Sequence, residues 1–438
     1  KGIYNNFSKA SVSLLEEAIE DQELIENHHL IFNTMATSMQ FPKGPVHINV
    51  PFQEPLYKTQ SSLYPVLENQ VWSNPSSNEF IEIPKWDENK KYLFIIGQNE
   101  WTYEWRDAVS GALAFSNITV MSESHGNAHG LGAIDQIDRW IMSLSEKQRE
   151  EWQWDVVVSM GHNVISRKVK TLIREKCAEH WSLQFQSKPI NTYRKNPLVL
   201  NVDPVSFLKG FLKEAVVGTL KNEHHLLNDL HKSELDHYLE SRPHSDLKVF
   251  YQLSRTLPLG CQLQMGNSSV VRYIQLMNQR GDIRYFGNRG VSGIDGCTST
   301  AVGASWVSQE KVVLVTGDLS FLYDANGLWM KNWPRNLKVV IIDNGGGGIF
   351  RIIDGAKDEI SVPTFFETPH RRDIKKWIEG WGWSAASFES IEEGDFIEFF
   401  NNDSSQILIV KTPSELNPIE LDLFFNYFKK YNERMENN

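Results

Sequence analysis

The sequence predicts an α/β protein built from successive parallel-sheet domains. Short apolar runs rich in β-branched residues alternate with longer helical stretches over most of the chain, which is typical of parallel strands joined by helical crossovers. A length of 438 residues is enough for two or three such domains. Polar or charged regions at residues 58–80 and 219–246 indicate connections. We therefore expect a partial first domain over residues 1–60, a central domain over 80–220 and a last domain over 245–438.

The composition is that of a globular protein and excludes several classes. A net charge of −11 and a pI near 5.7 argue against a general nucleic-acid or anionic-membrane binder. No uninterrupted apolar run of about 18 residues occurs, so no membrane span is expected. Cys177, Cys261 and Cys297 form no CxxC pair, which argues against a disulfide framework or a zinc site. Together with the absence of a signal-peptide pattern near Lys1, this predicts a reducing, cytoplasmic setting.

The first two domains are predicted from hydrophobic patterning. The first has an amphipathic helix within residues 11–39 and a strand at Val46–Val50. For the central domain, strands are expected at Tyr92–Ile96, Ile118–Ser122, Asp155–Met160, Ser182–Gln186 and Leu198–Val202, and helices at Trp105–Phe115, Ile134–Leu144 and Lys168–His180. No GxGxxG motif opens this domain, so a dinucleotide-binding interpretation lacks its phosphate loop.

The last domain carries the main chemical motif, between Val312 and Phe350. Its strands are expected at Ile283–Phe286, Val312–Thr316, Lys338–Asp343, Trp383–Ser387 and Gln406–Val410. Because parallel strands end at the same edge of a sheet, Asp318 and Asn344 should meet although they are 26 residues apart. A carboxylate, an amide oxygen and a glycine-rich backbone suit Mg²⁺ with a diphosphate, beside a helix that opens near Phe321. The alternative is an ordinary βαβ unit with an acidic turn.

Three further segments can bind anions or play structural roles. In Gly266–Arg272 (GNSSVVR), Asn267 and Ser268 are good helix N-caps, and Arg272 lies one turn further on the side of Ser268. In Gly287–Gly296, Arg289 suits an acidic substrate, and Ile294 beside Gly293 is either a wedge for a ligand or a core residue. The pair Arg167–Lys168 is either a solvated helix face or an anion site.

The histidines give no metal signal. His125 and His129 are four residues apart, but glycines weaken any helix between them and carboxylates are absent nearby, so a metal site there is disfavoured. The four histidines expected to be exposed on helices are His28, His29, His224 and His225.

The motifs together closely resemble one enzyme family. GNSSVVR, GNRGVSGIDG, GDLSFLYDANGL and DNGGGGIF occur in this order, preceded by GPVHINVPFQEPLY at Gly44–Tyr57. They are similar to the 2-succinyl-5-enolpyruvyl-6-hydroxy-3-cyclohexene-1-carboxylate synthases, the thiamine diphosphate-dependent enzymes of menaquinone biosynthesis. The resemblance implies a thiamine diphosphate-binding fold, with a partial pyrimidine-binding domain, a central domain and a diphosphate-binding domain. It also implies a homodimer or homotetramer with active sites between subunits.

The resemblance implies a transferase reaction and assigns residues to it. The reaction is decarboxylation of 2-oxoglutarate and 1,4-addition of the succinyl carbanion equivalent to isochorismate. Asp318, Asn344 and the carbonyl of Gly346 match the ligands of Mg²⁺, for which Mn²⁺ can substitute. The implied cofactor-binding residues are Asn267, Gly293, Ile294, Asp318, Leu319, Ser320, Asn344 and Gly346. The implied substrate-side residues are Ser268, Arg272, Arg289, Arg167, Lys168, Ile349 and Phe350.

The chain also departs from the family pattern. Asp343 and Gly345 replace asparagines that are usual beside the metal ligand, and Gly348 replaces a usual glutamine. No glutamate between Lys1 and Tyr57 matches the family's activating glutamate, so the chain is expected to lack the front of the first domain. Two alternatives remain: another thiamine diphosphate-dependent 2-oxo acid decarboxylase or carboligase, and a non-catalytic diphosphate-binding subunit.

Overall fold

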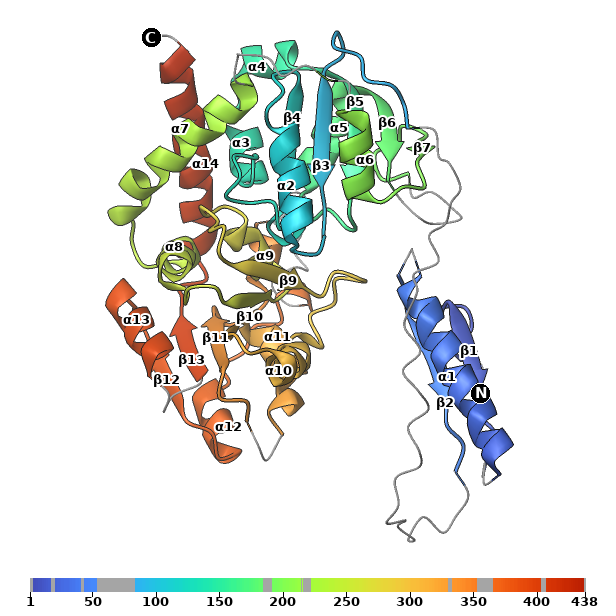
Figure 1. The fold of residues 1–438 in the computed structure, drawn as a ribbon. Helices are drawn as coiled ribbons and strands as arrows, with labels where there is room; N and C mark the ends of the chain where they lie inside the picture. Colours follow the sequence, from blue (N-terminus) through green and yellow to red (C-terminus); the bar gives the residue numbers. More distant parts are fainter. Residues whose placement is uncertain are drawn as a thin grey trace. The chain divides into compact units, whose positions relative to one another are not determined.

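The computed structural model describes residues 3–16, 20–40, 43–52, 83–183, 191–213, 215, 222–329, 333–352, 365–402 and 407–436. The chain divides into an N-terminal unit that ends near residue 82 and a larger unit that holds the other described residues. Every strand pair in the described part is parallel (Figure 1). The predicted α/β class with parallel sheets is therefore confirmed. Among the described helices, none combines the length and apolar character needed to cross a bilayer.

The N-terminal unit contains two parallel strands and one helix. β1 (Ala10–Ser13) pairs with β2 (Val46–Asn49), and α1 (Asp21–Met39) connects them. The predicted helix is wrong at its start, because residues 10–13 alternate in exposure and pair with β2 as a strand. The helix instead begins after a capping box formed by Glu20 and Glu23. The predicted linker at residues 58–80 lies outside the described residues.

The larger unit holds a five-stranded sheet in the order β4-β3-β5-β6-β7. Its strands are β3 (Tyr92–Ile96), β4 (Ile118–Ser122), β5 (Trp154–Met160), β6 (Cys177–Ser182) and β7 (Leu198–Val199). Its helices are α2 (Tyr103–Ala112), η1 (Ser124–Gly126), α3 (Ile137–Ser143), α4 (Glu146–Glu151), α5 (Arg167–Lys176) and α6 (Pro204–Phe211). β3 lies between β4 and β5 and is completely buried, because apolar side chains cover both faces of the sheet.

Two expectations for this sheet are wrong. The helix predicted over Lys168–His180 stops at Lys176, and the strand predicted at Ser182–Gln186 begins earlier, at Cys177. Pairing of β6 with β5 buries His180 and Trp181, and this tertiary contact overrides the helical preference of the Ala-Glu pair within β6.

The same unit holds a six-stranded sheet in the order β12-β13-β11-β10-β8-β9. Its strands are β8 (Gln262–Met265), β9 (Arg284–Gly287), β10 (Val312–Gly317), β11 (Leu337–Asp343), β12 (Ala385–Phe388) and β13 (Ile407–Lys411). Its helices are α8 (Asp246–Thr256), α9 (Ser269–Ile274), α10 (Cys297–Val307), α11 (Asp318–Tyr323), η2 (Ala325–Leu328), η3 (Gly348–Arg351), α12 (Ile374–Gly380), α13 (Glu393–Asn401) and α14 (Leu416–Glu436). β8 was not predicted, since its sequence QLQM is short and half polar. β10 and β11 form the centre of the sheet, as expected.

α7 (Glu223–Glu240) lies in the region predicted as a connection, and it packs against both sheets' helices rather than standing free. His224 and His225 are buried, which contradicts the expected exposure. His224 Nδ1 lies 2.8 Å from Thr119 Oγ1, and His225 Nε2 accepts the backbone N–H of Val120 at 3.0 Å. Beside α7, α14 returns to the five-stranded sheet, where Asn432 donates to the carbonyl of Ser143 (Figure 1). The boundary between a central and a last domain stays a prediction.

Candidate active site

A cavity of about 280 Å³ lies at the carboxyl ends of β8, β10 and β11. This edge of a parallel sheet is where ligands of open α/β folds bind. Ten of the predicted site residues line the cavity: Asn267, Ser268, Ile294, Asp318, Leu319, Ser320, Asn344, Gly346, Ile349 and Phe350. The fold therefore brings together residues that are spread over more than 80 positions of the sequence.

Asp318 is a buried acid in the lining of the cavity, as is Asp246. It begins α11 directly after β10, three residues before the predicted start of that helix, and its side chain is 2% exposed. Its Oδ1 accepts the backbone N–H of Leu319 at 2.7 Å, and its Oδ2 accepts that of Gly346 at 2.8 Å. His370 Nε2 lies 3.1 Å from the same Oδ2. The carboxylate is thus fixed in place by the two neighbouring strand ends.

Asn344, which follows β11, presents an unused oxygen. Its Nδ2 donates to Asp246 Oδ2 at 3.3 Å, and this contact turns the amide so that Oδ1 points away from Asp246. Oδ1 is buried and has no hydrogen-bond partner among the described residues. A buried oxygen without a partner costs free energy unless a ligand satisfies it. The donor set of Asp318 and Asn344 therefore fits an oxygen-preferring cation such as Mg²⁺.

The glycine-rich loop after Asn344 fits closely against residues 365–370. Gly346 has φ +153°, and a Cβ there would lie 2.6 Å from the carbonyl oxygen of Glu367. The N–H of Gly347 donates to this carbonyl, and the N–H of His370 donates to the carbonyl of Gly345. Only glycine allows the loop to follow this path past Asp318. The loop thereby leaves room for a ligand group beside the carboxylate.

A further carboxylate and a histidine lie beside Asp318, next to the cavity rather than in its lining. One ligand atom from each of Asp318, Asp343 and His370 lies within 4.8 Å of the others. Burial, together with the negative charge of nearby Asp318, raises the pKa of Asp343 to about 6. The hydrogen bond to Asp318 raises the pKa of His370. His370 gave no signal in the sequence, because it lies 26 residues beyond Asn344 in a charged segment.

Part of the cavity wall is apolar and includes Ile349, Phe350 and Phe366. Ile349 is buried, and the rings of Phe350 and Phe366 lie 5.5 Å apart. Ser320 Oγ donates to the carbonyl of Ile294 at 2.5 Å, which fixes the loop that carries Ile294 at the cavity. Ile294 is therefore a cavity residue rather than a core residue, as the wedge interpretation requires.

Asn267 links this wall to the candidate substrate cations. Its Nδ2 donates to the carbonyls of Asn288 (2.8 Å) and Gly293 (2.6 Å), and its Oδ1 accepts from Arg289 Nη1 at 2.5 Å. It does not cap α9. Ser268 occupies the N-cap position of α9, as the structural alternative predicted, but its side chain makes no capping hydrogen bond and its φ of +71° is strained for a serine.

The other predicted site residues do not line the cavity. Arg289 and Gly293 hydrogen-bond to the cavity residue Asn267, and Arg272 Nη1 donates to the carbonyl of the cavity residue Ser268 at 2.6 Å. Burial lowers the pKa of Arg272, and the nearby charge of Arg289 lowers it further. At the start of α5, Arg167 is exposed, and Lys168 Nζ lies over the ring of Phe425.

Comparison with known proteins gives a consistent result. No protein-family model matches the chain. The 2-succinyl-5-enolpyruvyl-6-hydroxy-3-cyclohexene-1-carboxylate synthase of Flavobacterium psychrophilum is 33% identical over 441 residues, which cover 98% of this chain and 78% of the relative. The enzyme of the same name from Flavobacterium johnsoniae is 34% identical over 441 residues, with 97% and 78% covered. That of Porphyromonas gingivalis is 32% identical over 412 residues, with 88% and 70% covered.

Proposed function

Because this chain belongs to the 2-succinyl-5-enolpyruvyl-6-hydroxy-3-cyclohexene-1-carboxylate synthase family, we propose that it catalyses the reaction after which the family is named. The substrates are 2-oxoglutarate and isochorismate, the second product is carbon dioxide, and the product enters menaquinone biosynthesis. The reaction uses thiamine diphosphate and Mg²⁺, with Mn²⁺ as a substitute. The shared name of the relatives does not favour the two alternative functions.

One observation carries the cofactor proposal. Asp318 and the unpartnered Oδ1 of Asn344 line one cavity with the glycine-rich loop, at the carboxyl edge of the sheet. We assign Asp318, Asn344 and the carbonyl of Gly346 to Mg²⁺, and Asn267, Gly293, Ile294, Leu319 and Ser320 to the surroundings of the cofactor. Asn344 is neutral, so it adds an oxygen without adding charge next to a diphosphate.

The protein's own residues bind and orient the substrates. When bound, thiamine diphosphate supplies the electron sink for loss of carbon dioxide from 2-oxoglutarate. Both substrates are dicarboxylates, and we assign their recognition to the cations Arg272, Arg289, Arg167 and Lys168, helped by Ser268. Arginine presents a planar pair of donors to a carboxylate, which fixes the substrate's orientation as well as its affinity.

Ile349 and Phe350 provide an apolar wall at the reacting end of the cavity. Carboxylate loss converts a charged group into neutral carbon dioxide, and an apolar wall that excludes water disfavours the charged group. The cation cluster and the apolar wall thus act on different parts of the same substrate.

The setting of the protein follows from the same family. We propose a homodimer or homotetramer in the cytoplasm. The three cysteines of the sequence all lie in the described part, where they are buried and free, as a reducing compartment allows.

The test is an assay of the full chain with 2-oxoglutarate and isochorismate, with thiamine diphosphate and Mg²⁺ present. Formation of the named product together with carbon dioxide is the expected result. Turnover of pyruvate alone would instead support another 2-oxo acid decarboxylase. Tight binding of the cofactor without turnover of either substrate would support a non-catalytic subunit.

A further inference from the structure

β9 is an outer strand of the six-stranded sheet, and within the described residues its strand pairing is confined to the edge that faces β8. Arg284 donates its backbone N–H to the carbonyl of Cys261, just before β8, so its backbone groups face β8. Alternate residues of a strand direct their backbone groups to opposite edges, so Tyr285 and Gly287 of β9 present theirs to the free edge. An unpaired edge leaves these groups to water or to another partner.

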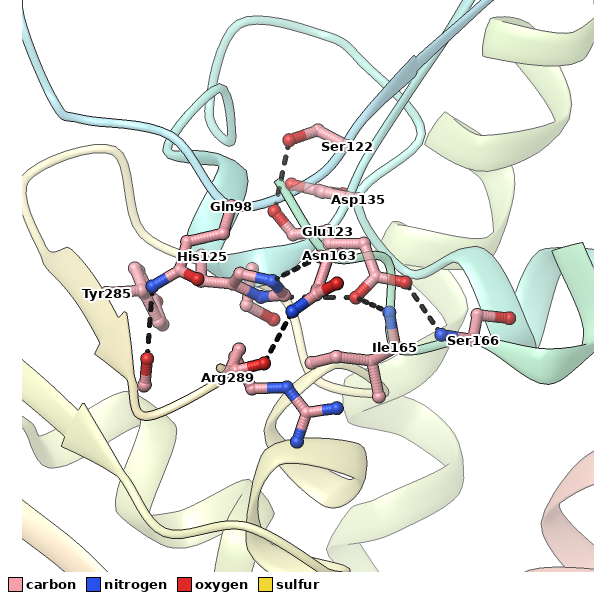
Figure 2. Close-up of polar contacts among 12 residues, drawn as sticks. Gln98, Ser122, Glu123, His125, Asp135, Asn163, Ile165, Ser166, Tyr285 and Arg289 are labelled. Carbon is pink, nitrogen blue, oxygen red and sulfur yellow. Dashed lines mark hydrogen bonds and ion pairs between the residues drawn. The ribbon is translucent and has the colours of Figure 1, made fainter. Parts of the chain in front are cut away.

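Side chains from the five-stranded sheet occupy this free edge. His129 Nε2 bonds the carbonyl of Ile283 at 2.9 Å, and Asn127 bonds both the N–H (3.0 Å) and the carbonyl (3.2 Å) of Tyr285. The contacts continue to Gly287, the last residue of the strand, and to Arg289 beyond it. Gln98 Nε2 donates to the carbonyl of Gly287 at 3.0 Å, and Asn163 Nδ2 donates to that of Arg289 at 2.5 Å (Figure 2).

These side chains come from one edge of the five-stranded sheet. Gln98 follows β3, Asn127 and His129 follow β4, and Asn163 follows β5. The three strands are neighbours in the order β4-β3-β5, so their carboxyl ends form a row. These side chains hydrogen-bond to backbone groups that a further strand would otherwise pair with. The last of them, Asn163, bonds the carbonyl of Arg289.

A buried carboxylate fixes the loop that carries Asn163. Glu123 is fully buried, and its two oxygens accept the backbone N–H groups of Ile165 and Ser166, each at 2.8 Å (Figure 2). Burial raises the pKa of Glu123, and the two N–H groups lower it. The same loop leads directly into Arg167 and Lys168 at the start of α5. The loop that Glu123 holds therefore contacts the backbone of Arg289 and continues into Arg167 and Lys168.

We propose that Gln98 and Asn163 are positioning residues for Arg289, and that through this arginine they set the affinity for the dicarboxylate substrate. The proposal rests on the proposed function, in which Arg289 binds a substrate carboxylate. Arg289 has its Nη1 on Asn267, while its backbone carbonyl receives the N–H of Asn163. Asn267 fixes the guanidinium group of Arg289 and Asn163 fixes its backbone, so the position of the guanidinium depends on both contacts. A bidentate carboxylate contact is sensitive to such small displacements.

The test combines Asn163→Ala, Gln98→Ala and Arg289→Ala in a double-mutant cycle. Asn163→Ala and Gln98→Ala should each raise the KM for 2-oxoglutarate about tenfold, as the loss of one positioning hydrogen bond does. The Kd for thiamine diphosphate, measured by calorimetry, should change less than twofold. In the Arg289→Ala background, removal of Asn163 should have no further effect on KM, because the two act on one contact.

Asn222→Ala is the matched control. Asn222 is also an asparagine that donates to backbone carbonyls of the five-stranded sheet, at Ser116 and Ile118, but it lies at the start of β4 rather than at its carboxyl end. This variant should lose stability without a change in KM. An unchanged KM in Asn163→Ala and Gln98→Ala would overturn the positioning role. The same rise in KM on removal of Asn163 in the Arg289→Ala background would overturn it as well. A wild-type chain that does not turn over 2-oxoglutarate would instead overturn the proposed function itself.

Discussion

Gly346 donates its backbone N–H to the carboxylate of Asp318 across 28 residues of sequence, with the nitrogen 2.8 Å from Oδ2. This bond joins the ends of the two central strands, β10 and β11. It also orients the carboxylate before any ligand binds, so little reorganisation is needed when a cation arrives. The position of the acid and the path of the glycine-rich loop are therefore one structural feature, and changes to either should affect the same binding event.

Asp318→Asn should weaken Mg²⁺ and thiamine diphosphate together. The amide keeps the shape of the side chain but removes its charge. In metalloproteins, mutation of a residue that hydrogen-bonds to a metal ligand typically lowers metal affinity about 10–100-fold. Loss of the charge of Asp318, the one charged residue among the assigned ligands, should lower it at least as much. Titration of the cofactor at several Mg²⁺ concentrations measures this, and each ligand should raise the other's affinity by the same factor. Asp203→Asn is the control, because Asp203 caps α6 and asparagine caps equally well. Normal cofactor affinity and Mg²⁺ dependence in Asp318→Asn would contradict the assignment.

Gly346→Ala should damage the site without unfolding the protein. The new Cβ would lie 2.6 Å from the carbonyl oxygen of Glu367, and the φ of +153° is strained for alanine. We expect a loss of about 1–3 kcal/mol in unfolding free energy and a large fall in cofactor affinity. Gly290→Ala, where nothing lies within 4 Å of the new Cβ, is the control and should behave as the wild type in urea unfolding. Equal behaviour of the two variants would refute the close packing described for this loop.

Arg289→Ala and Arg272→Ala should chiefly affect substrate use. Loss of a charge-assisted contact should cost roughly 1.5–3 kcal/mol of transition-state stabilisation in kcat/KM. The cofactor should bind nearly as before, since neither side chain lines the cavity. Arg284→Ala is the control, because Arg284 is an arginine on β9, the strand that leads to Arg289, and it pairs with Glu310 instead. If kcat/KM is unchanged in both variants, these arginines do not bind the substrate.

Acid should destabilise the protein partly through His225. Its Nε2 accepts the N–H of Val120, and burial lowers its pKa from about 6.5 to about 4. The unfolded chain therefore takes up a proton from this histidine at a higher pH than the folded chain. Stability due to this group is complete above about pH 6.5 and is lost as the pH falls toward 4. Asp246 and Asp343, with pKa values raised to about 6, change stability in the opposite direction.

The measurement is urea unfolding of wild type and His225→Gln between pH 7 and pH 4.5. The variant should lose up to about 1.4 kcal/mol per pH unit less than the wild type within the titration window, which corresponds to one proton. Identical slopes for the two proteins would show that His225 is not kept neutral by burial.

Much of the fold could be predicted from the sequence because its central strands are strongly apolar. β3, β4, β10 and β11 are rich in β-branched and other large apolar residues that are buried on both faces, and their predicted bounds agree with the structure to within about a residue. β6 and β8 could not be predicted in this way. Their residues are mixed, and only pairing with the neighbouring strands makes them strands.

The candidate site was predictable where chemistry and strand ends coincide. Asp318 and Asn344 each follow an apolar strand, so topology alone places them together. Asp246 and His370 do not follow an apolar strand. Asp246 lies at the start of a helix and His370 lies in a loop, and tertiary packing brings both to the site. Glu123 was also missed, since a single acid after a strand does not reveal that it is fully buried.

The row of side chains along β9 has a consequence for aggregation. A bare strand edge is a template onto which a strand of another molecule can add. Here residues that lie far earlier in the chain occupy that edge, so a C-terminal fragment that begins after α7 would expose carbonyls at Ile283, Tyr285 and Gly287. Such a fragment should self-associate through β9 even if its own sheet folds. The five-stranded sheet therefore shields this edge of its neighbour from pairing with a strand of another molecule.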